Sequence, residues 1–149
     1  MDYKEGIHYE TQKIMKSGTK PDFTFYLPDD KSINMDSKFP LTIYMEISKL
    51  NRDLEDETLD EIARREITDS IKAKTKEFLD KSIKTKIDDT ASREGYIAPD
   101  EDTVDFVLMN IPLENLYHFL LTSVIGSSKT PVIEYAFSRK VILVSPQPL

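Results

Sequence analysis

The sequence predicts an α/β fold in which helices pack on a mixed β-sheet that contains an antiparallel hairpin. Three observations carry this prediction. Asp22–Lys38 has the composition of two strands joined by a turn, and Asp53–Asp89 repeats apolar residues at helical spacing. Val104–Ile111 and Val141–Val144 are short apolar runs, as expected of strands covered on both faces of a sheet. Strands and helices that alternate in this way are typical of a layered α/β domain.

The N-terminal third is predicted to form three strands. Ile7–Met15 alternates in polarity at its start, and Ser17–Pro21, with its glycine and proline, ends it. Asp22–Leu27 is rich in Phe, Thr and Tyr, which favour strands. Leu27–Lys31 is a turn signal, so Ser32–Lys38 is expected to return antiparallel to Asp22–Leu27.

Helices are predicted next. Pro40 suits a first helical turn, so a short helix is expected over Leu41–Leu50. Asp53–Asp89 is expected to be one long helix or a helix pair. Its charges run from acidic to basic, as the helix dipole prefers, and a solvated face is favoured over a DNA-binding face. The residues expected on its inner side are Leu59, Ile62, Ala63, Ile67, Ile71, Phe78, Ser82, Ile83 and Ile87.

The C-terminal part completes the sheet. Ala91–Asp102 is expected to be a loop, and Val104–Ile111 is the next strand. Pro112–Thr122 and Pro131–Ser138 are expected helices, and Val141–Val144 is the last strand, ended by Ser145 and Pro146. Two strands joined through a helix are expected to be parallel. The predicted order is β-β-β-α(α)-β-α-(α)-β.

Composition narrows the function. The 149 residues suggest one domain, 1–149, and the net charge of −7 argues against a broad basic face for DNA. The chain has no Cys and two isolated His, which excludes thiolate chemistry and makes a histidine metal cluster unexpected. It has no apolar run near the ~20 residues of a membrane span. A cytoplasmic protein, or a cytoplasmic fragment of one, is expected.

The hairpin is predicted to bring two carboxylates together. If the chain folds back about Asp29, Asp22 lies opposite Asp36. Directly opposed residues have Cα atoms roughly 4.5–5.5 Å apart. Lys38 follows two residues after Asp36, so its side chain is expected on the same face.

Two acids and an ammonium at one spot suggest a divalent cation beside a phosphate. Mg²⁺ takes oxygen ligands, which Asp22, Asp36 and the backbone carbonyl of Ser37 could supply. A bound metal acts as a Lewis acid and lowers the pKa of its water. Lys38 is expected to hold that water or to neutralise charge on the transition state.

Other interpretations stay open. Glu10 and Gln12 lie on the preceding strand, and either is a candidate third polar group if that strand pairs alongside. An edge-strand glutamate in contact with solvent is the alternative for Glu10. Asp and Lys are also common on hairpin surfaces, so a surface ion pair worth under about 1 kcal/mol is an alternative for the whole constellation.

Several blocks resemble a known family. Pro21-Asp22, a spacer, and then Asp36-Ser37-Lys38 resemble the signature of PD-(D/E)XK nucleases. The closer resemblance is to one branch, the RmuC family of DNA recombination proteins. The blocks that carry it are Gly6–Gln12, Lys20–Asp29, Met35–Leu41, Val104–Glu114 and Tyr135–Pro146.

The resemblance implies a restriction-endonuclease-like core and a role in DNA recombination or in limiting rearrangement, with DNA as the partner. It implies Mg²⁺ or Mn²⁺ on Asp22 and Asp36, with Lys38 as the catalytic lysine. A catalytically inactive DNA-binding or scaffold module that keeps the fold is the second hypothesis. The membrane anchor, coiled coil and glutamate-bearing first helix that are usual in the family are absent, so a core fragment or minimal member is expected. The charge pattern permits a homodimer without requiring one.

Overall fold

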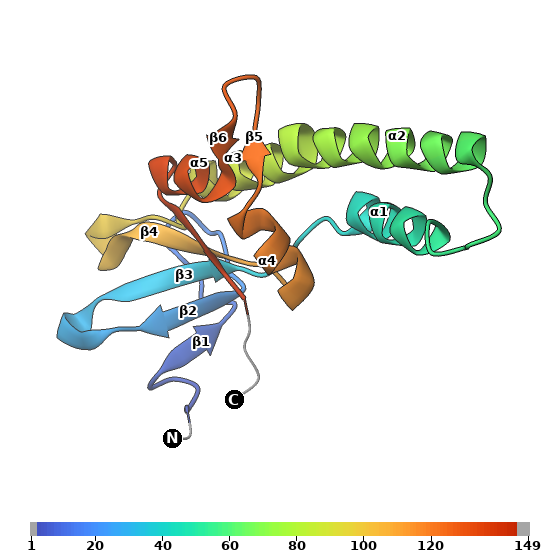
Figure 1. The fold of residues 1–149 in the computed structure, drawn as a ribbon. Helices are drawn as coiled ribbons and strands as arrows, with labels where there is room; N and C mark the ends of the chain where they lie inside the picture. The colour runs from blue at the N-terminus through green and yellow to red at the C-terminus, as the bar shows by residue number, and fades with distance from the viewer. Residues whose placement is uncertain (1–2, 146–149) are drawn as a thin grey trace.

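The computed structural model describes residues 3–145, and Pro146 lies outside the described residues. Its main sheet has the order β1-β2-β3-β4-β7. The pairs β1–β2 and β2–β3 are antiparallel, whereas β3–β4 and β4–β7 are parallel. The mixed sheet with an antiparallel hairpin is therefore confirmed (Figure 1). The strands are β1 (Tyr9–Thr11), β2 (Phe23–Tyr26), β3 (Ser32–Asp36), β4 (Thr103–Asn110) and β7 (Val141–Val144).

Helices lie over one face of this sheet. Helix α3 (Lys84–Ser92) and helix α5 (Val132–Ser138) lie above the strands in Figure 1. Helix α5 connects β4 and β7, which are parallel as the crossover rule requires. Helix α4 (Glu114–Leu121) and a two-stranded ribbon, β5 (Val124–Ile125) with β6 (Thr130–Pro131), precede α5.

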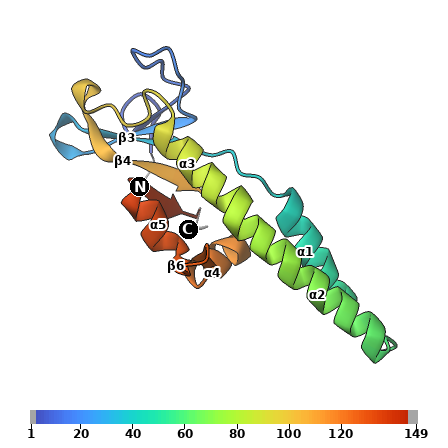
Figure 2. The same ribbon diagram turned by 90° about the horizontal axis from the view of Figure 1, so that it is seen from above.

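A two-helix arm projects away from the sheet. Helix α1 (Thr42–Asp53) lies beside helix α2 (Glu61–Glu77), and Figure 2 shows both extending past the strands. The predicted helix start at Asp53 was wrong, because residues 54–60 form a loop. The side chain of Asp60 caps α2 by accepting from the Ala63 N–H at 2.7 Å. The expected inward position of Ile62 was also wrong. It is 72% exposed, because this end of α2 lies beyond the sheet.

Helix α2 continues into α3 through one π-helical segment, η2 (Phe78–Ile83). The wider turn shifts the helical register, and such segments are frequent at functional sites. Phe78, Ile83 and Ile87 are fully buried in the core, as their spacing predicted. The continuous helix formed by α2, η2 and α3 therefore begins to cover the sheet at η2.

The covered face of the sheet changes character from strand to strand. On β4 and β7 it is apolar, with Val107, Met109 and Val141 buried. On β3 the buried positions are instead Ser32, Asn34 and Asp36, whereas Ile33 and Met35 point to the outer face. Buried polar groups must be hydrogen-bonded to be tolerated. This reversal singles out β3 as the strand whose buried side chains need partners.

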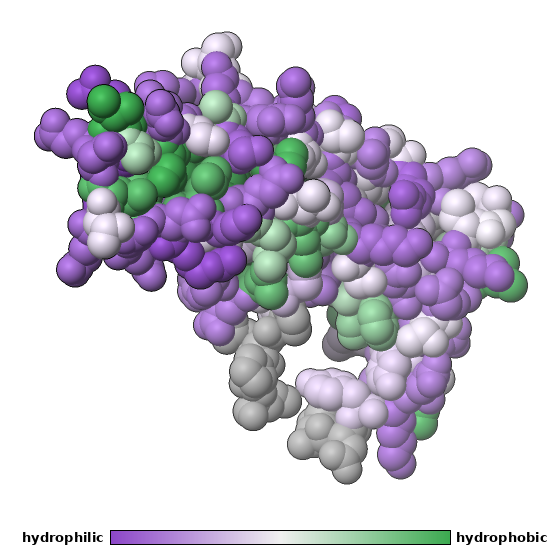
Figure 3. Space-filling model, turned by 90° about the vertical axis from the view of Figure 1, so that its right-hand side faces the viewer, coloured by the Kyte–Doolittle hydropathy of each residue, from purple (hydrophilic) through white to green (hydrophobic). Residues whose placement is uncertain are grey.

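The first strand is shorter than Ile7–Met15 because Gln12 adopts a left-handed conformation, with a φ of 54° directly after Thr11. Within the described residues, no helix combines the length and the apolar composition that a membrane span would need. The face that Figure 3 shows is mostly hydrophilic, and its apolar residues form separate patches.

Candidate active site

The hairpin register places Asp22 and Asp36 across from each other. Phe23 pairs with Met35 and Thr24 with Asn34, so the next position outward brings Asp22 opposite Asp36. The chain reverses at a short turn in which Asp29 and Asp30 have φ angles of 64° and 59°. Short polar residues tolerate this left-handed conformation better than others. The geometry agrees with the opposition that the sequence predicts.

Asp36 is completely enclosed. Its side chain is 0% exposed, and both of its oxygens accept hydrogen bonds. Oδ1 accepts from the backbone N–H of Lys38 at 3.1 Å. Oδ2 accepts from Lys86 Nζ at 2.8 Å and from Thr90 Oγ1 at 3.4 Å, and Arg93 Nη1 lies 3.7 Å away. A buried carboxylate is tolerated only when it is paired in this way.

Asp22 is half-buried and is held by different partners. Its Oδ2 accepts from the backbone N–H of Ser37 at 2.9 Å, and its Oδ1 accepts from Gln12 Nε2 at 3.3 Å. Burial raises the pKa of Asp22, but the hydrogen bonds from Ser37 and Gln12 and the charge of Lys38 outweigh it. The pKa therefore lies below its usual 3.8. Asp22 is thus held as a carboxylate.

The two candidates on the first strand occupy different positions. Gln12 reaches Asp22 and belongs to the cluster. Glu10 instead lies opposite Thr24 and interacts with Tyr26. Burial, together with the hydrogen bond and charge of Glu10, raises the pKa of Tyr26 to about 12. Gln12 therefore contacts the Asp22 carboxylate, whereas Glu10 interacts with Tyr26.

Lys38 lies at the edge of the cluster. Strand β3 ends at Asp36, so strand alternation no longer fixes the direction of the Lys38 side chain, which is exposed. Its backbone N–H contacts Asp36, and its charge lowers the pKa of Asp22. Within the described residues, the ion pairs of Asp36 are formed by Lys86 and Arg93.

Sequence reasoning missed Lys86, Thr90 and Arg93. They lie at spacings of four and three residues, which places them on one side of a helix and its end. Lys86 and Thr90 belong to α3, and Arg93 caps its C-terminus. The polar row beside the buried Ile83 and Ile87 is the signal that could have identified these three residues. A basic helix segment is usually solvated, however, and the sequence therefore favours a solvated face.

The loop after α3 positions Arg93. Gly95 has a φ of +84°, and a Cβ there would overlap Ser17 Oγ and Thr19 Oγ1. Thr19 Oγ1 also donates to the Glu94 carbonyl at 2.6 Å. From the sheet, Asn34 Nδ2 donates to the Tyr96 carbonyl at 2.9 Å. The loop is therefore fixed between the sheet and residues 17–19.

Arg93 itself is tied to the same loop. Its guanidinium donates to the Tyr96 hydroxyl at 3.4 Å and lies 5.3 Å from the ring centre. That hydrogen bond, with the nearby charges of Asp36 and Asp22, raises the pKa of Arg93. With 42% of its side chain exposed, Arg93 presents a fixed positive charge to solvent.

A shallow hollow of about 420 Å³ adjoins the cluster. Lys86 lies in its wall, together with other residues from η2, α3 and the chain after β3: Pro40, Lys81, Ser82, Thr85 and Asp89. Two lysines facing a hollow next to paired carboxylates can attract an anionic group such as a phosphate.

The donor set can be compared with that of a metal site. Within residues 3–145, no group of three or more acidic, histidine or cysteine side chains is arranged to hold a metal ion. Two carboxylates nevertheless suffice for Mg²⁺, which keeps several of its waters. The Lys86 ammonium already places a cation against Asp36. Asp22 and Asp36 therefore fit a divalent cation in charge and ligand type, whereas the ligand role of the Ser37 carbonyl stays a prediction.

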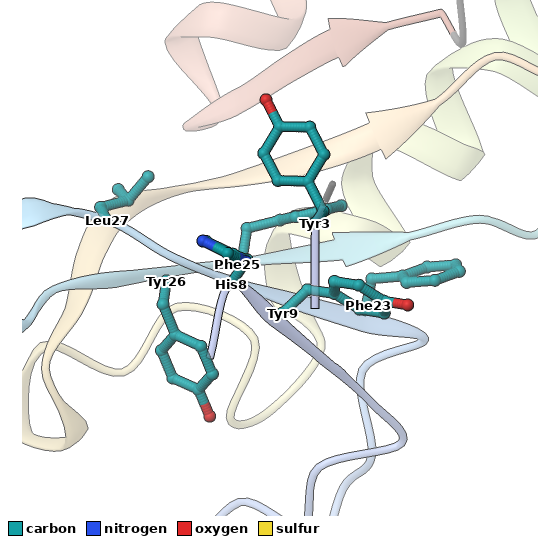
Figure 4. Close-up of a pocket in the computed structure, with 7 residues that line it drawn as sticks. All are labelled: Tyr3, His8, Tyr9, Phe23, Phe25, Tyr26 and Leu27. Carbon is teal, nitrogen blue, oxygen red and sulfur yellow. The ribbon is translucent and has the colours of Figure 1, made fainter. Parts of the chain in front are cut away.

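A second hollow, of about 500 Å³, lies apart from this cluster. Figure 4 shows its lining residues, most of them aromatic: Tyr3, His8, Tyr9, Phe23, Phe25, Tyr26 and Leu27. Phe23 and Phe25 alternate with the buried Thr24, so their rings lie on the outer face of the sheet, opposite Asp36. Their ring centres are 6.0 Å apart in a stacked arrangement. This hollow takes no part in the carboxylate cluster.

Comparisons with known proteins bear on the cluster. The model of the RmuC family matches residues 1–149. A curated relative, the DNA recombination protein RmuC homolog of Pasteurella multocida (strain Pm70), is 30% identical over 146 residues. The match covers 95% of this chain and 24% of the relative, so the chain spans about a quarter of that protein's length. No solved structure matches the chain.

Proposed function

Because the chain belongs to the RmuC family, we propose that it is a DNA-processing domain of the PD-(D/E)XK nuclease type. Its reaction would be metal-dependent hydrolysis of phosphodiester bonds during DNA recombination or the control of rearrangement. The name of the Pasteurella relative supports the process. The antiparallel hairpin followed by the parallel strands β4 and β7 supports a restriction-endonuclease-like core.

One observation carries the proposal. Asp22 and Asp36 oppose each other at the open end of the β2–β3 hairpin, beside a cationic group from α3 and its end. Paired carboxylates that lie among cations, next to a hollow, suit chemistry on a phosphate.

In this reaction Asp22 and Asp36 would hold Mg²⁺ or Mn²⁺. When bound, the ion supplies Lewis acidity and a water of lowered pKa. Lys38 would hold the attacking water or neutralise the charge that develops on the phosphate oxygens. Gln12 and the Ser37 N–H fix the orientation of the Asp22 carboxylate.

Arg93 would contact a phosphate of the bound DNA on the solvent-exposed side of the cluster. Its guanidinium is anchored on Tyr96 and is partly exposed, so it can bind a phosphate without first being ordered. The hollow beside Lys86 would receive the DNA backbone next to the cluster.

A second candidate function is a DNA-binding or scaffold module without catalysis. It is favoured by the complete enclosure of Asp36, whose oxygens are both hydrogen-bonded to groups of the chain. This module would bind DNA through its cations with no need for metal.

A cleavage assay separates the two functions. Single- and double-stranded DNA, linear and circular, are incubated with the protein and Mg²⁺ or Mn²⁺. We expect wild-type cleavage that Asp36→Asn and Lys38→Ala abolish. Asp105→Asn serves as the control, because Asp105 pairs with Lys140 on the exposed surface. DNA binding that is metal-independent and survives Asp36→Asn and Lys38→Ala, with no cleavage, would favour the scaffold module.

A further inference from the structure

Asp36 has no direct path to solvent. Its side chain is 0% exposed, and its Oδ2 is covered by Lys86, Thr90 and Arg93. An ion that binds Asp36 through Oδ2 must therefore displace one of these groups.

Lys86 is the group with room to move. Thr90 is fully buried, and Arg93 is fixed by its hydrogen bond and ring contact with Tyr96. The Lys86 side chain is 12% exposed and lies in the wall of the 420 Å³ hollow. A lysine ammonium on its flexible stem can turn from Asp36 toward this hollow by rotations of the side chain alone.

The charges make such an exchange favourable. Without the Lys86 ammonium or a metal ion, Asp36 would be a buried charge whose remaining ionic partner among the described residues is the more distant Arg93. Such a poorly paired buried charge is costly. A divalent ion carries twice the charge of an ammonium and also attracts Asp22. The freed ammonium would face the hollow, where a phosphate can accept it.

We propose that Lys86 is an internal substitute for the divalent cation. Its ammonium neutralises Asp36 while no metal is bound, and it swings into the adjoining hollow when the ion binds. Lys86 thus sets the metal affinity and lowers it below that of the carboxylates alone. The inference rests on the proposed function for the identity of the ligand, but it concerns binding and not cleavage.

Calorimetric titration with Mn²⁺ alone tests the exchange. Lys86→Gln removes the competing charge and is expected to tighten Mn²⁺ binding at least about tenfold, because the ion no longer has to break a buried ion pair. Lys84→Gln is the matched control, since Lys84 lies on the same helix and its ammonium lies 5.9 Å from the Tyr135 ring centre. Its Mn²⁺ affinity should equal that of the wild type. Thermal unfolding in chelator and in Mn²⁺ should show the largest metal-induced stabilisation in Lys86→Gln.

If Lys86→Gln does not fold, Lys86→Arg tests the exchange instead. Arginine pairs with a carboxylate through two donors, so this variant should bind Mn²⁺ more weakly than the wild type. Equal or weaker Mn²⁺ binding by folded Lys86→Gln, or unchanged binding by Lys86→Arg, would overturn the exchange.

Cleavage assays on the same preparations distinguish the two proposals. Wild-type cleavage with no change of Mn²⁺ affinity in Lys86→Gln would overturn the exchange and leave the nuclease function standing. Tighter Mn²⁺ binding in Lys86→Gln without cleavage by any form would support the exchange and overturn the nuclease function. No Mn²⁺ binding by any form would overturn both.

Discussion

The carboxylate of Asp36 lies 2.8 Å from the ammonium of Lys86, although fifty residues separate them in the chain. The contact joins β3 to α3 on the face of the sheet that the helices cover. Each side chain neutralises the charge of the other. This matters because Asp36 is fully enclosed and Lys86 nearly so, and neither element supplies the opposite charge by itself. The fold and the proposed chemistry therefore depend on the same pair.

Breaking this pair from one side should destabilise the fold. Lys86→Met leaves Asp36 enclosed with a weaker ionic partner, and we expect a loss of about 3 kcal/mol in the free energy of unfolding. Urea denaturation measures it. Lys84→Met, an exposed control on the same helix, should change stability by no more than about 0.5 kcal/mol.

Removing both charges should be milder than removing one. Asp36→Asn combined with Lys86→Met eliminates the uncompensated carboxylate and keeps an acceptor for the Lys38 N–H. The double variant should be more stable than Lys86→Met by at least about 1 kcal/mol. If the two losses simply add, the pair is not coupled.

Gly95 should resist substitution more than Gly18 does. Both have φ angles near +85°, so alanine costs each about 1 kcal/mol of backbone strain. Only at Gly95 does a Cβ meet Ser17 and Thr19, which should add about 1–3 kcal/mol. Thermal or urea unfolding of Gly95→Ala and Gly18→Ala measures the difference. Equal losses would mean that residues 17–19 move aside freely.

Asp22 should contribute to acid sensitivity. Its pKa is lowered in the folded state, so the stability it provides is complete above its usual 3.8 and is lost as the pH falls through the lowered value. Asp22→Asn should therefore lose less stability than the wild type between pH 5 and pH 2. Urea unfolding at both pH values measures this. Identical pH profiles for the two proteins would contradict the interaction of Asp22 with Ser37, Gln12 and Lys38.

Arg93 should contribute one phosphate contact. If the proposed DNA binding is correct, Arg93→Ala should weaken it and reduce the slope of log affinity against log salt by about 1. Fluorescence anisotropy over a range of salt concentrations measures this slope. Arg65→Ala is the control, because Arg65 lies exposed on the projecting α2. Equal slopes for both variants would place the DNA elsewhere.

The hairpin could be predicted because its information is local. The Phe and Thr content of β2 and the turn after Leu27 fix the strands, and antiparallel pairing then sets which residues oppose each other. The strands β4 and β7 could also be predicted, because their apolar runs differ in composition from the sequence around them. The expectation that both faces of these strands are covered was wrong, because helices lie over one face of the sheet and burial alternates along both strands.

The α3 side of the site could not be predicted in the same way. Lys86 and Arg93 meet Asp36 only because the helix crosses the sheet there, and a lysine on a helix is normally solvated. The predicted burial of Ile62 was wrong for the converse reason. Its spacing suits a buried face, but the sheet that would cover it ends before the arm does.

A crystal soaked in Mn²⁺ together with a short DNA duplex shows whether Asp22 and Asp36 hold a metal ion beside a phosphate. We expect an anomalous peak between the carboxylates of Asp22 and Asp36, with the Lys86 ammonium turned away from Asp36 and a DNA phosphate beside the ion. An empty site with Lys86 still on Asp36, or a manganese ion bound away from both carboxylates, would contradict it.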